Sequence, residues 1–168
     1  MTVPTITLHE TRPDVEPGLG ALRGYLRDIL GRFEGRPGTD SDVDAFMAEY
    51  PDDEGLVPPQ GVFLLATDPD GTVLGCVGLR YRGPDVPSDA AEVKRMWTAP
   101  AARGLGVGKM LLAEVTRRAR EAGRARLVLD TRADLMEART LYERAGFVET
   151  ESYNENRHAQ VWYALDLR

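Results

Sequence analysis

The sequence predicts an α/β protein built on one mixed sheet, and three observations lead to this class. Segments in which apolar residues alternate with polar ones predict strands, and segments in which they recur every three or four positions predict helices. Along the chain these segments give the order β-α-α-β-β-β-α-β-α-β-β. The 168 residues fit a single domain over 1–168, and a content of 42% hydrophobic and 29% charged residues is typical of a globular protein.

The elements of the first half follow from this spacing and from proline and glycine pairs, which mark the turns between them. The second helix should begin with Asp40 or Ser41 as its N-cap and turn Val43, Phe46 and Met47 inward. The predicted elements are a strand at 5–10, a helix at 16–33, this second helix, an acidic loop at 51–59, and a hairpin of strands at 61–68 and 72–82.

The second half continues with helices between strands. Its strongest amphipathic helix begins at Gly106 and ends at Gly123, because glycine readily takes the positive φ of a helix C-terminus. The predicted elements are a loop at 83–88, a strand at 90–98, helices at 106–122 and 134–145, and strands at 126–131, 147–152 and 159–167.

Composition excludes several classes of function. A net charge of −6 argues against general nucleic-acid binding, and no apolar run approaches the ~20 residues of a membrane span. One cysteine, Cys76, rules out a disulfide framework and a cysteine-based zinc site, and two histidines make a histidine-rich metal site improbable. We therefore expect a soluble cytoplasmic protein with no metal, no nucleic-acid partner and no membrane partner, in which Cys76 is buried and inert.

The charges are distributed unevenly. Residues 37–79 contain nine acids and no lysine or arginine, whereas residues 94–126 contain nine bases and two acids. One end of the molecule could attract cations and the other anions, although two solvated faces without any ligand would give the same pattern.

The most informative segment is the turn Arg103-Gly104-Leu105-Gly106-Val107-Gly108-Lys109, which leads from a strand into a helix. Glycines let a ligand approach the backbone, and the first-turn N–H groups of a helix have no helical partner. With the positive end of the helix dipole and two flanking bases, these groups form an anion site suited to a phosphate-bearing cofactor.

Three cofactor classes use such a turn. A P-loop fails, because Gly108-Lys109 is followed by Met110 where serine or threonine is required. A Rossmann or S-adenosylmethionine site would take Asp130 as its ribose-binding acid. However, the strand before the turn is not continuously apolar, and only 38 residues follow Asp130, which is too few for the remaining units. The third class is coenzyme A.

For this third class the sequence resembles the GCN5-related N-acetyltransferases (GNAT). Arg103-x-x-Gly106-x-Gly108 matches the Arg/Gln-x-x-Gly-x-Gly/Ala motif of that family. The resemblance covers about 90–150, through Ala91–Pro100 before the motif and Ala138–Phe147 after it. It implies a single-domain GNAT-like fold, with a mixed, mostly antiparallel sheet flanked by helices and a splayed central strand pair.

The resemblance also implies that acetyl-CoA is the acetyl donor and that an amine attacks its thioester directly. The pantetheine arm would pair with the strand backbone at Met96 and Thr98. Glu92 falls where some members place a general base, although it could instead only pair with Lys94 or Arg95. Tyr142 matches the tyrosine that protonates the departing thiolate, although core packing is the alternative. The cofactor-binding set is therefore Met96, Trp97, Thr98, Arg103, Gly104, Leu105, Gly106, Val107, Gly108 and Lys109.

One position departs from the family pattern, because Leu135 stands where relatives often carry a cofactor-contacting asparagine. Asp130 or Asp134 could supply that contact instead. His158, in the loop between the last two strands, is a weaker candidate for acceptor binding or for the base. Trp97 and Trp162 are typical packing residues.

Two function classes remain on this fold: an N-acetyltransferase, and a non-catalytic acyl-CoA-binding or sensing module. Binding needs only the glycine turn, whereas catalysis also needs Glu92 or a substitute and Tyr142, so their joint presence favours the enzyme. The acceptor is a small-molecule or peptide amine, and the acidic stretch 37–79 favours a cationic one. Homodimer formation is left open.

Overall fold

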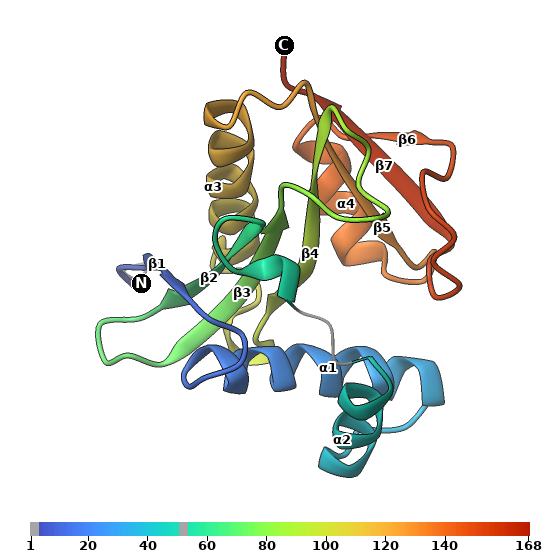
Figure 1. Ribbon diagram of the computed structural model, residues 1–168. Helices are drawn as coiled ribbons and strands as arrows, with labels where there is room; N and C mark the ends of the chain where they lie inside the picture. The colour runs from blue at the N-terminus through green and yellow to red at the C-terminus, as the bar shows by residue number, and fades with distance from the viewer. Residues whose placement is uncertain (1–3, 51–53) are drawn as a thin grey trace.

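A seven-stranded sheet runs through the computed structural model, which describes residues 4–50 and 54–168 (Figure 1). No helix within these ranges is both long and apolar enough to cross a membrane. The strands are β1 (Thr7–Thr11), β2 (Gly61–Thr67), β3 (Val73–Arg80), β4 (Ala90–Thr98), β5 (Arg126–Thr131), β6 (Val148–Thr150) and β7 (Val161–Asp166). The helices are α1 (Gly18–Glu34), α2 (Asp40–Glu49), α3 (Val107–Glu121) and α4 (Met136–Arg144), with short 3-10 turns η1 (Glu54–Leu56) and η2 (Pro100–Ala102).

The sheet order β1-β2-β3-β4-β5-β7-β6 confirms the predicted mixed, mostly antiparallel architecture. Every neighbouring pair is antiparallel except β4 and β5. These two strands pair only over residues 90–92 and 126–128. Beyond that point β4 stays with β3 and β5 stays with β7, so the central strands separate as expected.

Both faces of the sheet are covered, and the alternation of side chains shows how. On β2, Val62 and Leu64 belong to the core cluster that includes α3, whereas Phe63 and Leu65 belong to the cluster that includes α1 and α2. All seven residues of β2 are buried, which explains its continuously apolar sequence. Cys76 lies in the second cluster and is fully buried, as predicted.

Element boundaries differ from the predicted ones by one or two residues at most ends. The clearest error is the N-cap of α2, which is Thr39 and not Asp40 or Ser41. Thr39 accepts a hydrogen bond from the Asp42 amide, and the Asp42 carboxylate accepts one from the Thr39 amide. This reciprocal capping box is more favourable than a cap at either later residue. Of the predicted acidic loop, residues 51–53 lie outside the described part of the chain, and η1 forms within the rest.

Helix α1 lies close against β4, which gives a stability prediction. A Cβ added at Gly24 would lie 2.6 Å from the Trp97 ring, so Gly24→Ala should lower the free energy of unfolding by about 1–3 kcal/mol through overpacking. Gly20→Ala on the same helix is the matched control, because its Cβ would meet only the flexible end of Glu16 and gains helix propensity. Urea unfolding compares the two variants, and equal destabilisation would contradict this packing.

Candidate functional site

A groove of about 1290 Å³ opens where β4 and β5 separate. One end lies between α3 and α4, and its wall includes Leu112, Thr116 and Leu141. The other end lies beside α1, α2 and the loop before β7, and its wall includes Ile29, Phe46 and His158. The C-terminal part of β4 forms the floor between them, because residues 93–98 all line the groove. A single site could therefore hold two ligands that meet at β4.

The glycine turn lies at the α3–α4 end. Gly104 and Gly106 both have φ of 82°, in the left-handed region that favours glycine. Gly106 is the N-cap of α3. Across the described chain, no carbonyl accepts the amides of the two glycines or those of the first three helical residues, Val107–Lys109. Five free donors at a helix N-terminus are the geometry that the predicted anion site requires.

Glycine at position 108 has a separate, packing reason. A Cβ there would lie 3.1 Å from Leu141 Cδ2, 3.4 Å from Thr98 Oγ1 and 3.5 Å from Met96 Cε. Gly108 thus brings the first turn of α3 against both β4 and α4, beside Tyr142.

The structure brings nearly all of the predicted cofactor-binding residues to one groove. Leu105 is the exception, because its partly exposed side chain does not line the groove. Trp97 lines the groove and also packs on α1, where its indole donates to Asp28 Oδ2 at 2.9 Å. Arg103 forms an ion pair with the same carboxylate at 2.9 Å. The residues that line the groove are Met96, Trp97, Thr98, Arg103, Gly104, Gly106, Val107, Gly108 and Lys109.

Tyr142 lines the groove from α4 and is 5% exposed. Its ring packs against Phe147 and Tyr163, so the packing role holds. Its hydroxyl, however, has no hydrogen-bond partner in the described part of the chain. Burial raises the pKa of this phenol well above its ordinary value, so it remains a proton donor at neutral pH. Packing fixes the ring, and the hydroxyl is left available to a ligand.

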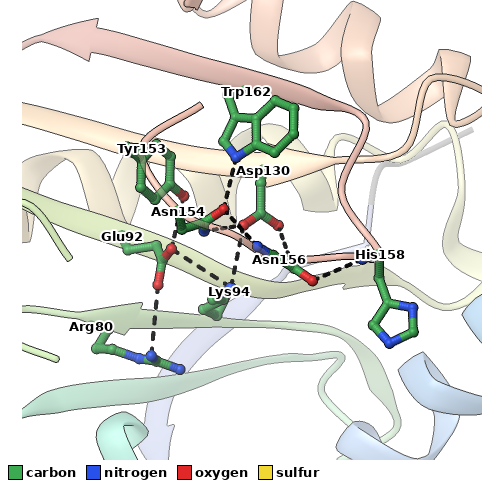
Figure 2. Close-up of polar contacts among 9 residues, drawn as sticks. All are labelled: Arg80, Glu92, Lys94, Asp130, Tyr153, Asn154, Asn156, His158 and Trp162. Carbon is green, nitrogen blue, oxygen red and sulfur yellow. Dashed lines mark hydrogen bonds and ion pairs between the residues drawn. The ribbon is translucent and has the colours of Figure 1, made fainter. Parts of the chain in front are cut away.

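Glu92 lies in a polar network and not on the wall of the groove (Figure 2). The Tyr153 hydroxyl donates to Glu92 Oε2 at 2.8 Å, Lys94 Nζ lies 3.6 Å from that oxygen, and Arg80 Nη1 lies 3.8 Å from Oε1. The alternative role of pairing with Lys94 is thus present, with Arg80 in place of Arg95. Glu92 Oε1 nonetheless has no hydrogen-bond partner among the described residues.

The environment of Glu92 favours its neutral form. The side chain is 1% exposed, and burial raises its pKa more than Lys94, the Tyr153 hydroxyl and Arg80 lower it. Glu92 lines a smaller cavity of about 440 Å³ that shares the wall residues Arg80, Lys94 and Asn156 with the groove. Any exchange of a proton between Glu92 and the groove therefore crosses this shared wall.

Asp130 lies at the end of β5 and joins the same network from the groove side. Asn154 and Asn156 donate to its two oxygens at 2.7 and 3.1 Å, and Lys94 Nζ lies 3.7 Å away (Figure 2). Sequence reasoning missed the two asparagines, although their polar loop between two strands was the available signal. Leu135 lines the groove with an apolar side chain. Of the two acids expected to replace the missing asparagine, Asp130 lines the groove, whereas Asp134 does not and pairs with Arg132.

The acid-rich stretch 37–79 contributes part of the groove wall but few of its acids. Of its described acids only Glu49 lines the groove. Asp40, Asp42 and Asp44 are ion-paired with arginines of α1 or with Arg36. Asp52 and Asp53 lie outside the described residues. The described acids of this stretch, apart from Glu49, therefore do not supply the acidic wall on which the prediction of a cationic acceptor relies.

Comparison with known proteins relates the chain to acetyltransferases. The family model described as the acetyltransferase (GNAT) family matches residues 25–147. An uncharacterized N-acetyltransferase of Schizosaccharomyces pombe is 38% identical over 107 residues, which is 63% of this chain and 63% of that protein. The IAA acetyltransferase of Azospirillum brasilense is 36% identical over 94 residues, 56% of this chain and 59% of that protein. The chain thus covers less than two thirds of the length of these relatives.

Solved structures agree on the fold. A GNAT-family acetyltransferase from Staphylococcus aureus Mu50 superposes with a TM-score of 0.73 at 20% identity. The superposition covers 98% of this chain and 100% of that one.

Proposed function

Because the chain belongs to the acetyltransferase (GNAT) family, we propose that it is an N-acetyltransferase that moves the acetyl group of acetyl-CoA directly onto an amine. One observation carries the proposal. A single groove has free backbone amides at one end, the Tyr142 side chain in its wall, and a second open end beside α1 and α2.

The glycine turn fits a pyrophosphate. No heavy atom lies within 4 Å of a Cβ built at Gly104 or Gly106, so both glycines border open space that a side chain would enter. Lys109 adds positive charge beside it, and Arg103 lies there paired with Asp28. Met96 and Thr98 line the groove beyond the point where β4 and β5 stop pairing, and in this proposal their backbone holds the pantetheine arm.

Acetyl-CoA supplies an activated thioester. The amine nitrogen forms a bond to the carbonyl carbon, the carbon–sulfur bond breaks, and Tyr142 donates its phenolic proton to the departing thiolate sulfur. A backbone N–H of β4 polarises the carbonyl oxygen. Before the attack, the acceptor ammonium loses one proton to Glu92 through water, since Glu92 lies behind the shared wall of Arg80, Lys94 and Asn156. The second proton leaves the nitrogen as the amide forms and restores the Tyr142 phenol.

This role for Glu92 predicts an effect on the pH profile. Because burial raises its pKa, the acidic limb of kcat/KM should lie above ~4.3, the ordinary glutamate value. Glu92→Gln should lower kcat/KM by about 100-fold at mildly acidic and neutral pH and less at alkaline pH, where the amine arrives deprotonated. Asp130→Asn tests the competing carboxylate. If Asp130→Asn removes the limb and Glu92→Gln leaves the profile parallel to the parent, Asp130 is the base.

The raised pKa of Glu92 also predicts how the stability of the fold depends on pH. The dependence has the opposite sign to that of a carboxylate whose pKa an ion pair lowers. A carboxyl with a raised folded-state pKa stabilises the fold while it is protonated. Relative to Glu92→Gln, the parent should lose free energy of unfolding as the pH rises from the ordinary glutamate pKa through the raised one. Urea unfolding of both proteins across this window gives the difference, and a parent that gains stability instead would contradict the burial argument.

A further inference from the structure

The end of the groove beside α1, α2 and the loop before β7 is called the acceptor end here, since the glycine turn lies at the other end. We propose that this acceptor end selects an amine carried on an aromatic or other flat apolar body without a second positive charge. This inference rests on the proposed acetyltransferase function and names the substrate class of that site.

The acceptor end is lined by an aromatic cluster of Phe33, Phe46, Tyr50 and His158. The rings of Phe33 and His158 are stacked, with centroids 5.9 Å apart and an interplanar angle of 8°. Phe46 lies 4.8 Å from Tyr50, and Tyr50 meets His158 edge-on at 5.9 Å. Helix α1, helix α2 and the loop before β7 thus converge on one surface made of rings.

Core packing does not account for this cluster. Phe46 packs partly on the buried cluster beneath α1 and α2, but Phe33, Tyr50 and His158 belong to neither core cluster. His158 is exposed, and its backbone amide donates to Asn156 Oδ1 at 3.0 Å, which fixes the loop that carries the ring. Partly exposed rings held in a groove wall offer area for a flat apolar ligand.

A cationic body is disfavoured because the protein's own guanidinium groups lie over these rings. The guanidinium carbon of Arg132 lies 4.5 Å from the centroid of the Phe33 ring. That of Arg157 lies 5.8 Å from the Tyr50 centroid, and that of Arg95 lies 5.9 Å from the Phe46 centroid. These three positive charges would repel a second ammonium group on the ligand, whereas an uncharged apolar body meets no such repulsion.

The carboxylates of the groove give a second reason. Each carboxylate that lines it in the described ranges is already ion-paired, so a second ligand ammonium would share its carboxylate with a cation of the protein. The pairs are Asp28 with Arg103, Glu49 with Arg157, Asp130 with Lys94, and Glu137 with Arg32.

The test compares kcat/KM for 2-phenylethylamine, hexylamine and 1,6-diaminohexane, measured as thiol release from acetyl-CoA. We expect the aromatic amine to exceed hexylamine by about 10-fold or more, a discrimination typical of apolar pockets, and hexylamine to exceed the diamine. A diamine that equals or exceeds 2-phenylethylamine would overturn the inference.

Two variants test whether the aromatic cluster causes this discrimination between amines. Phe33→Leu should raise the KM for 2-phenylethylamine about 10-fold while leaving the KM for acetyl-CoA unchanged. Tyr81→Leu is the matched control, because Tyr81 is also half-buried but does not line the groove. This variant should prefer 2-phenylethylamine over hexylamine to the same degree as the parent. If Phe33→Leu retains the parent's preference, the cluster does not select the acceptor.

Failure of the acetyltransferase function gives a different result, namely no amine-dependent thiol release with any of the three amines. In that case calorimetric binding of 2-phenylethylamine to the parent and to Phe33→Leu still decides the inference. Binding that Phe33→Leu weakens supports the subsite, and absence of binding to the parent overturns it.

Discussion

Replacing Gly106 with aspartate is expected to weaken acetyl-CoA binding by at least about 100-fold, or about 2.7 kcal/mol. Gly106 is the N-cap of α3, and the space beyond its Cα is open, so a carboxylate there would occupy the phosphate site and repel the anion. Aspartate is among the residues that tolerate positive φ, so the variant should fold. Calorimetric titration with acetyl-CoA gives the dissociation constant.

The matched control is Gly123→Asp at the other end of α3. Gly123 has φ of 73°, no heavy atom within 4 Å of an added Cβ, and no place in the groove. The control thus carries the same backbone cost and the same charge change, and it should bind acetyl-CoA as the parent does. If a folded Gly106→Asp also binds like the parent, the glycine turn is not the phosphate site.

Tyr142→Phe should lower kcat by about 100-fold with little change in the affinity for acetyl-CoA. The substitution keeps the ring that packs on Phe147 and Tyr163 and removes only the hydroxyl, which has no hydrogen-bond partner in the described part of the chain. Loss of a general acid costs about 10²–10⁴ in rate, and an effect on kcat alone marks an interaction made in the transition state.

Tyr163→Phe is the control for this prediction, since Tyr163 is also buried and lies against Tyr142 but does not line the groove. Its hydroxyl accepts from Arg139 and donates to Glu143, so this variant should lose stability and keep kcat. Turnover of Tyr142→Phe at the parent's rate, under conditions where chemistry is limiting, would leave Tyr142 a packing residue.

Local patterns predicted much of the fold and of the donor end of the groove. The spacing of Gly104, Gly106 and Gly108 was sufficient to predict free amides at the start of α3, because the first-turn N–H groups of a helix have no helical partner. The order of strands and helices was likewise readable from periodicity. The splayed strand pair came from the family resemblance.

The acceptor end could not be predicted in the same way. Its rings come from three segments that sequence distance separates, and Phe33 and Phe46 read as ordinary apolar positions of amphipathic helices. The bulge in β4 was not predicted either. Cys76 of β3 pairs with Trp97 and Gly78 pairs with Lys94, so β4 has one residue more than β3 over this stretch. Arg95 takes φ of 54° within it. Charge counting failed for Asp40, Asp42 and Asp44, because it does not show their ion pairs with Arg23 and Arg27 of α1 and with Arg36 before α2.

The central claim is that one groove both binds acetyl-CoA and transfers its acetyl group to an amine. The most direct test incubates the protein with acetyl-CoA and 2-phenylethylamine and follows free thiol and N-acetylated amine together by mass spectrometry. We expect the two products to form in equal amounts and only in the presence of both protein and amine. If acetyl-CoA binds at the glycine turn but a broad panel of amines releases no thiol, the protein is a non-catalytic acyl-CoA-binding module and the claim is wrong.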